Sequence, residues 1–242
     1  MSTTIDIRLP DGAIKQMPNG STPFEVAQSI SEGLARAVIS ASYNGTTIET
    51  TTPLQENGEL VLYSWTNDEG KKAFWHSSAH LLAQALEQLY PGIKLTIGPA
   101  IDSGFYYDID PGEHSISEKD LTAIEKRMIE LARGKHAFSL RSVAKAEALS
   151  FYKAAGNEYK TELIENLDDG SITFCDHDDF TDLCRGGHVP NTGIIKAVKL
   201  TNIAGAYWRG DEQNKQLTRI YGVSFPKQKL LTEHLELLEE AK

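Results

Sequence analysis

The stretch His76-Ser-Ser-Ala-His80-Leu-Leu-Ala-Gln-Ala-Leu86 determines how the larger part of this chain is expected to fold. Its apolar residues recur at the spacing of an amphipathic helix, and they continue to Leu89. His76 and His80 are four positions apart, so the predicted helix carries both imidazoles on one face, about 6 Å apart. The helix is therefore expected to present two ring nitrogens to a common site.

A second motif of the same spacing, Cys184-Arg-Gly-Gly-His188, lies about a hundred residues further along the chain. Its two glycines and the following Pro190 favour a loop or tight turn over a helix, and Asp182 is expected in the same loop. Converging on one cleft, the two motifs would form either a zinc site or a metal-free hydrolytic site. The alternative is structural: hydrogen-bonded histidines on a half-buried helix, with Cys184 as a small buried apolar residue.

Composition places the chain among globular proteins. Its 242 residues can form one large or two modest domains, and 40% of them are hydrophobic and 24% charged. The sequence has no apolar run long enough for a transmembrane helix, and its start lacks the features of a signal or transit peptide. Cys175 and Cys184 are expected to be reduced thiols, and the protein is expected to be cytoplasmic.

The net charge of −10 argues against non-specific nucleic-acid binding through a basic surface. Basic residues do cluster between positions 126 and 145, but from charge alone they are interpreted as solvated helix faces.

Residues 1–63 are predicted to form a small β-grasp, ubiquitin-like domain. The strands 5–9 and 13–17 form a hairpin around Pro10-Asp11-Gly12, and a helix at 24–30 follows with Thr22 or Ser21 as its N-cap. Further strands are predicted at 37–43, 46–49 and 58–63. This segment contains no His or Cys, so it is interpreted as a docking module without catalytic residues.

The polar segment 66–70 marks the boundary to a larger α+β domain with an antiparallel sheet. Its predicted strands are 94–97, 104–109, 138–143, 172–175, 196–201 and 219–225, and its helices after the His76/His80 helix are 117–133, 144–155 and 159–164. Residues 226–242 form an apolar-periodic helix without a C-terminal cap, which predicts a continuation into a further domain.

Several motifs in order make the chain resemble the N-terminal region of bacterial-type threonyl-tRNA synthetases. Besides the two motifs above, they are Ile97-Gly-Pro99, Gly104-Phe-Tyr-Tyr-Asp108, Glu158-Tyr-Lys160, Asp182-Leu-Cys184 and Ala204-Gly-Ala-Tyr-Trp-Arg-Gly-Asp211. By this resemblance, residues 1–63 are a TGS domain, 64–225 an editing domain and 226–242 a linker helix. The synthetase core would be absent, so the chain is not expected to charge tRNA.

The resemblance implies hydrolysis of seryl-tRNA(Thr), with threonyl-tRNA(Thr) spared. Serine lacks one methyl of threonine, and one such group in a pocket is worth only about 1–3 kcal/mol of discrimination. A second site that accepts serine and excludes threonine would supply the missing selectivity.

The resemblance also assigns roles to residues. His76 and His188 would flank the ester and activate water, and Lys160 would offer a cation; these are the expected catalytic residues. Substrate would be bound by a second group, in which Asp182 holds the α-amino group and Tyr107 forms a wall or hydrogen-bonds the seryl hydroxyl. His80 and Cys184 would complete the cleft, and Gly98 and Pro99 would let the main chain approach the substrate closely. The alternatives are an exposed helix lysine, a turn or N-cap aspartate and a merely packed tyrosine.

No cofactor is expected for editing, and a metal-free site is favoured. Related alanyl-type editing domains are understood to hold zinc at a similar pair of motifs, so if zinc is present its ligands would be His76, His80, Cys184 and His188. The expected partners are the acceptor end of tRNA(Thr) carrying serine and the rest of the synthetase chain, with no membrane.

Three other functions remain open from the sequence. The two motifs could form a structural zinc site in a binding module without hydrolytic activity. Cys184 could be the nucleophile of a hydrolase, activated by a neighbouring histidine. Residues 1–63 could be a regulatory ligand-binding domain on an inert scaffold.

Overall fold

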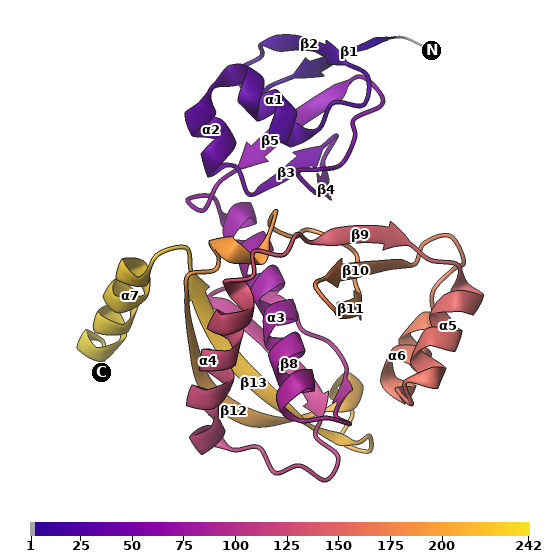
Figure 1. Cartoon of the computed structure of the whole chain (residues 1–242), viewed down its shortest axis with the longest axis vertical. Coiled ribbons are helices and arrows are strands. Elements are labelled where there is room, and N and C mark those ends of the chain that lie inside the picture. The colour runs from indigo at the N-terminus through magenta and orange to yellow at the C-terminus, as the bar shows by residue number, and fades with distance from the viewer. Residues whose placement is uncertain (1–2) are drawn as a thin grey trace. The chain divides into compact units, whose positions relative to one another are not determined.

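The structure is a computed structural model that describes residues 3–242 (Figure 1). Met1 and Ser2 belong to the N-terminal start that was expected to lack a signal or transit peptide, and they lie outside the described residues. The chain divides into two compact units: the first extends to Phe74 and also includes Gly186–Pro190, and the second contains Trp75–Arg185 and Asn191–Lys242. The limits 1–63, 64–225 and 226–242 assigned from the sequence stay predictions.

The first unit is built on a five-stranded sheet with the strand order β2-β1-β5-β3-β4. Strands β1 and β5 are parallel, and the other neighbours are antiparallel. This is the predicted β-grasp arrangement. Its elements are β1 (Thr4–Arg8), β2 (Ile14–Pro18), α1 (Pro23–Ile30), α2 (Glu32–Ala37), β3 (Ser40–Tyr43), β4 (Thr46–Ile48) and β5 (Gly58–Tyr63).

Helix α1 begins where the sequence predicts, because the Thr22 side chain accepts a hydrogen bond from the Glu25 N–H. Helix α2 was not predicted, and the strand expected from Ala37 begins at Ser40 instead. Ser31 explains the difference, since it ends α1 and its hydroxyl then caps α2 by accepting the Leu34 N–H. Val26 of α1 packs with apolar residues of the sheet, among them Ile5, Ile7, Ala41 and Leu60. Ala35 of α2 packs with Ala27 of α1.

The second unit contains most of the remaining elements. They are α3 (Asp68–Leu89, which begins in the first unit), β6 (Lys94–Leu95), β7 (Ala100–Ile101), β8 (Gly104–Asp110), α4 (Leu121–Ala132), β9 (Ser139–Ser142), α5 (Lys145–Ala154), α6 (Glu158–Glu165), β10 (Thr173–His177), β11 (Phe180–Leu183), β12 (Ala197–Tyr207), β13 (Gln216–Phe225) and α7 (Gln228–Glu240).

The larger sheet of this unit is antiparallel, with the order β12-β13-β8-β6 and with β7 also paired to β8. Helix α3 is fixed to β13 by two hydrogen bonds: the Trp75 indole N–H donates to the Ser224 carbonyl at 3.0 Å, and the Ser78 and Ser224 hydroxyls are 2.6 Å apart. Helix α4 contacts β12 (Figure 1). The core of the unit therefore includes the helix that carries His76 and His80.

A second, three-stranded sheet has the order β11-β10-β9 and packs with α5 and α6 (Figure 1). Its apolar contacts involve Val143, Ala148, Tyr152, Ile164, Ile172 and Phe174. Helix α6 is fixed to β6 by the Asn157 amide, which donates to the Leu95 carbonyl at 2.8 Å. This contact brings α6 close to β8, which pairs with β6.

The prediction that Asp182 lies in the loop with Cys184 is wrong, because Asp182 lies on β11 opposite Cys175. The segment from Cys184 to Val189 has neither helix nor strand, as its glycines indicated. Within residues 3–242, none of the helices combines the length and apolar character that a bilayer requires.

The core of the first unit yields a stability prediction. The Ile7 side chain is fully buried whereas that of Ile14 is 58% exposed. Ile7→Ala should lower the free energy of unfolding by about 2–5 kcal/mol because it leaves a cavity. Ile14→Ala, the matched control, should change it by no more than about 0.5 kcal/mol. Urea unfolding curves of both variants give the comparison, and equal effects would contradict this packing.

Candidate functional site

His76 and His80 lie on the same side of α3, as their spacing predicts. Their ring centroids are 4.9 Å apart. Neighbouring α3 residues such as Ala79, Leu81 and Leu82 are fully buried and hold the helix in the core. His80 is buried as well, but His76 is only partly buried. Of the two imidazoles, His76 is therefore the one that solvent can reach.

Cys184 lies directly after β11 and points toward the helix. Its Sγ is 3.3 Å from His76 Nε2. Its backbone is fixed by Thr173, whose carbonyl accepts the Cys184 N–H at 3.1 Å and whose hydroxyl donates to the Cys184 carbonyl. Cys184 and Cys175 are both reduced thiols and form no disulfide with each other, as expected.

The centre of the site is the carboxylate of Asp182, which is buried and receives three donors. Lys160 Nζ lies 2.7 Å from Oδ1. The Tyr107 hydroxyl donates to Oδ2 at 2.8 Å, and His80 Nδ1 lies 3.1 Å from the same oxygen. Lys160 Nζ is also 3.3 Å from the Tyr107 hydroxyl. An ionised carboxylate only accepts hydrogen bonds, so His80 Nδ1 carries a proton here.

The charges of this group depend on one another. Burial alone would raise the pKa of Asp182, but the Lys160 ammonium and the hydrogen bond from His80 outweigh it, and the pKa lies below its usual range. Burial would lower the pKa of His80, yet the neighbouring Cys184 and the bond to Asp182 leave it raised. Burial and the negative charge of Asp182 raise the pKa of Tyr107, which is therefore a neutral donor.

Lys160 is 2% exposed, so the alternative of an exposed helix lysine is wrong. It lies in the first turn of α6, and the N-cap Asn157 accepts the Lys160 N–H at 3.0 Å. The amide group of Asn157 donates to the Leu95 carbonyl. One side chain thus starts α6, joins it to β6 and fixes the backbone of Lys160.

Tyr107 lies on β8, and Gly98 allows the chain to pass close to its ring. A Cβ added at Gly98 would lie 2.1 Å from Tyr107 Cδ2, so only glycine fits there. The predicted close approach of the main chain at Gly98 and Pro99 is thus directed at Tyr107. A contact of these two residues with substrate stays a prediction.

His188 belongs to the first unit, and Glu49 holds it there. The Glu49 carboxylate accepts the Gly187 N–H at 2.7 Å and the His188 N–H at 3.1 Å. His188 Nδ1 is 3.2 Å from Glu49 Oε1. The sequence analysis missed Glu49 and found no catalytic residue in this segment. No spacing rule could have found it, because Glu49 and His188 are 139 positions apart.

The structure thus brings six of the predicted site residues together in the second unit: His76, His80, Tyr107, Lys160, Asp182 and Cys184. Gly98 and Pro99 lie beside Tyr107. Such a group combines a solvent-reachable imidazole with a buried cation, a phenol and a carboxylate, which suits proton transfer and the stabilisation of a developing negative charge.

Three of these residues could also hold a metal ion. The ligating atoms of His76, His80 and Cys184 all lie within 4.8 Å of one another, and two imidazoles with a thiolate suit zinc. The bond between His80 Nδ1 and Asp182 resembles the carboxylate contact that often orients a zinc-bound histidine. The donor set therefore fits zinc, and the expectation of a metal-free site stays a prediction.

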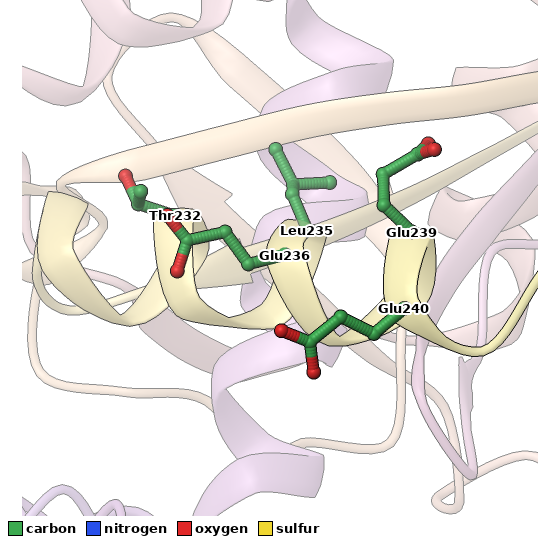
Figure 2. A pocket seen from close by; sticks show the side chains of 5 residues that line it. All are labelled: Thr232, Leu235, Glu236, Glu239 and Glu240. Atoms are coloured by element: carbon green, nitrogen blue, oxygen red, sulfur yellow. The ribbon is translucent and has the colours of Figure 1, made fainter.

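A hollow lies along α7, far along the chain from these residues (Figure 2). It is lined by Thr232, Leu235, Glu236, Glu239 and Glu240. This lining offers carboxylates from one face of a single helix but no imidazole, thiol or cation. It lacks a base beside a cation, so the group around Asp182 is the better candidate for chemistry.

Two known domain families match parts of the chain. Residues 5–63 match the TGS domain. Residues 172–221 match the threonyl and alanyl tRNA synthetase second additional domain, which includes Asp182, Cys184 and His188.

Relatives with a curated name are similar over nearly the whole chain. The threonine–tRNA ligase of Flavobacterium johnsoniae is 69% identical over 238 residues, which are 98% of this chain and 36% of the relative. Those of Porphyromonas gingivalis and Cytophaga hutchinsonii are 56% and 53% identical, with 37% of each relative covered. The chain thus spans a little over a third of these relatives and corresponds to their N-terminal part, which confirms the resemblance.

The buried charge of Asp182 gives a stability prediction with a pH dependence. Asp182→Asn leaves the Lys160 ammonium without its counter-ion and should cost about 3–5 kcal/mol at neutral pH. Because the folded-state pKa of Asp182 is depressed, its contribution is present above about pH 4 and is lost as the pH falls. The stability gap between wild type and variant should therefore narrow between pH 5 and pH 3.

Urea unfolding at a series of pH values measures the difference in the free energy of unfolding between the wild type and Asp182→Asn. Glu212→Gln, at an exposed position, is the control and should show a small, nearly constant difference. A gap for Asp182→Asn that widened on acidification would contradict an ionised, stabilising Asp182.

Proposed function

We propose that this chain hydrolyses seryl-tRNA(Thr) and spares threonyl-tRNA(Thr), as the editing part of a threonine–tRNA ligase. The observation that carries the proposal is the buried Asp182 carboxylate, which holds Lys160, Tyr107 and His80 together next to His76 and Cys184. The match of residues 172–221 to the second additional domain of threonyl and alanyl tRNA synthetases supports it. Charging tRNA would belong to the remaining two thirds of such a ligase.

The need for this activity follows from the similarity of serine and threonine. A synthetic site that fits threonine also admits the smaller serine, and the missing methyl costs about 1–3 kcal/mol at most. An editing site can exclude threonine by leaving no room for its methyl group. A closely packed wall serves this purpose better than a flexible one, and Tyr107, held by Asp182 and by the approach of Gly98, would be that wall.

The reaction is an ester hydrolysis. A water oxygen adds to the seryl carbonyl carbon and gives up one proton to a base. The tetrahedral intermediate then expels the ribose oxygen of the terminal adenosine, which takes up a proton. The products are serine and tRNA.

His76 is the proposed base in the second unit, because it is the partly exposed imidazole of the helix pair. A part for His188 in the hydrolysis is proposed from the resemblance alone. Lys160 would place a positive charge near the developing oxyanion, where charge stabilisation is most effective in a water-poor site.

Asp182 would act in two ways. It orients Lys160, and it offers a lone pair to the α-ammonium group of the substrate. A carboxylate has about four acceptor positions, and three of them are used by Lys160, Tyr107 and His80. The remaining position would select esters that carry a free amino group.

Zinc held by His76, His80 and Cys184 would supply a Lewis acid for the carbonyl or a more acidic bound water. The proposal favours hydrolysis without it. His76 Nε2 and the Cys184 thiol lie 3.3 Å apart, which is also the geometry of a Cys–His nucleophile pair. This contact keeps the thiol mechanism as the second candidate.

The substrate specificity and the base can be tested in one assay. The chain should deacylate Ser-tRNA(Thr) and leave Thr-tRNA(Thr) intact. His76→Ala and Lys160→Met should slow the seryl reaction by about 10²-fold or more, because each removes a group that acts in the transition state. His114→Ala and Lys119→Met, at exposed positions, are the matched controls.

Circular dichroism of each variant shows whether it remains folded. Folded His76→Ala and Lys160→Met variants with full activity would exclude the assigned roles. Equal hydrolysis of both esters would contradict the methyl sieve.

The metal and the thiol are tested in a further pair of experiments. Seryl-tRNA hydrolysis should persist after treatment with a chelator and in Cys184→Ser. Loss of activity and of folding on chelation would instead support a zinc-stabilised module. Loss of activity in a folded Cys184→Ser variant, together with fast alkylation of Cys184 in the wild type, would support the thiol nucleophile.

A further inference from the structure

Glu49 follows β4 in the β-grasp sheet, yet its carboxylate is occupied by the end of the CxxxH motif. Its two oxygens together face three nitrogen atoms, those of the Gly187 and His188 backbones and His188 Nδ1, at 2.7–3.2 Å. Glu49 is 8% exposed and His188 is 1% exposed. A buried carboxylate with this many partners is costly to place unless each of them donates to it.

The backbone donors determine which tautomer His188 adopts. A backbone N–H can only donate, and one binds each oxygen of Glu49, so both oxygens act as acceptors. The ring nitrogen Nδ1 faces one of these oxygens and must therefore carry a proton. In a neutral imidazole the other nitrogen, Nε2, then carries the lone pair.

The glycines of the motif make this arrangement possible. Gly186 and Gly187 have φ values of 104° and 87°, in the left-handed region that other residues rarely adopt. This conformation directs the successive N–H groups of Gly187 and His188 to a single carboxylate. The Arg-Gly-Gly-His segment thus binds an anion through its backbone N–H groups, and this anion is the Glu49 carboxylate.

We propose that Glu49 is a positioning residue for His188: it holds the ring so that Nε2 presents its lone pair for catalysis. The inference rests on the proposed function only for the role of His188 in hydrolysis. The tautomer follows from the geometry alone.

The decisive measurement is the protonation of the two ring nitrogens of His188. In the whole chain labelled with ¹⁵N-histidine, the ¹⁵N shifts at pH 8 distinguish a protonated nitrogen from one with a lone pair. His188→Asn identifies the His188 signals by their absence. The amide of an Asn can also still donate to Glu49, so this variant keeps the loop anchored.

In the wild type we expect Nδ1 to be protonated and Nε2 to carry the lone pair. In Glu49→Gln, one oxygen and an amide group face three donors, so the bond to His188 Nδ1 should be lost and a mixture of tautomers should appear. Glu59→Gln, at an exposed position of the same sheet, should leave the tautomer unchanged.

Hydrolysis of seryl-tRNA(Thr) is the second readout. Residues that orient a catalytic histidine typically contribute about 10–100-fold, so Glu49→Gln should slow the reaction by that factor. His188→Asn should hydrolyse seryl-tRNA(Thr) at least as slowly as Glu49→Gln, although its loop still binds Glu49. Glu59→Gln should have the wild-type rate.

The outcomes separate this inference from the proposed function. A wild-type His188 with its proton on Nε2 overturns the inference, and this measurement needs no variant to fold. An unchanged tautomer in folded Glu49→Gln, or an unchanged rate where the wild type is active, also overturns it. A wild type with the expected tautomer but no hydrolysis would count against the proposed function and leave the anchoring by Glu49 established.

Discussion

The ion pair between Asp182 and Lys160 is the interaction on which the rest of the site depends. Both groups are about 2% exposed, and an isolated charge at either position would cost several kcal/mol. Their contact at 2.7 Å offsets part of that cost, and it leaves a second oxygen of Asp182 to orient Tyr107 and His80. One carboxylate thus determines the direction of three functional side chains from three different elements.

The pair in turn requires the smaller sheet and its helices. Asp182 lies on β11, and Lys160 reaches it from the first turn of α6. Asn157 sets the start of α6 and ties it to β6, which pairs with the strand that carries Tyr107. The chemistry at the centre of the site is therefore sensitive to residues that are not part of it, through the positions of these elements.

The sequence predicts those features of the site that depend on neighbouring residues in the chain. The spacing of His76 and His80 places them on one helix face, and the glycines after Cys184 predict a loop. The strand position of Asp182 was not foreseen, because Cys184 and the following glycines suggested that the loop began earlier. Helix α2 was missed for a similar reason, since Ser31 both ends one helix and starts the next.

The sequence does not predict contacts between residues that are far apart along the chain. Nothing near Glu49 in the sequence distinguishes it from other acidic residues of the β-grasp segment, and its partner is 139 positions away. The sequence offers one indication, the pair Gly186-Gly187. Both residues have positive φ values in the structure, a conformation in which successive backbone N–H groups can face one anion. A glycine pair next to a candidate catalytic histidine therefore marks a backbone that can bind an anion, although only the structure can say which group binds there. Here that group is the carboxylate of Glu49, from the β-grasp segment that carries no His or Cys.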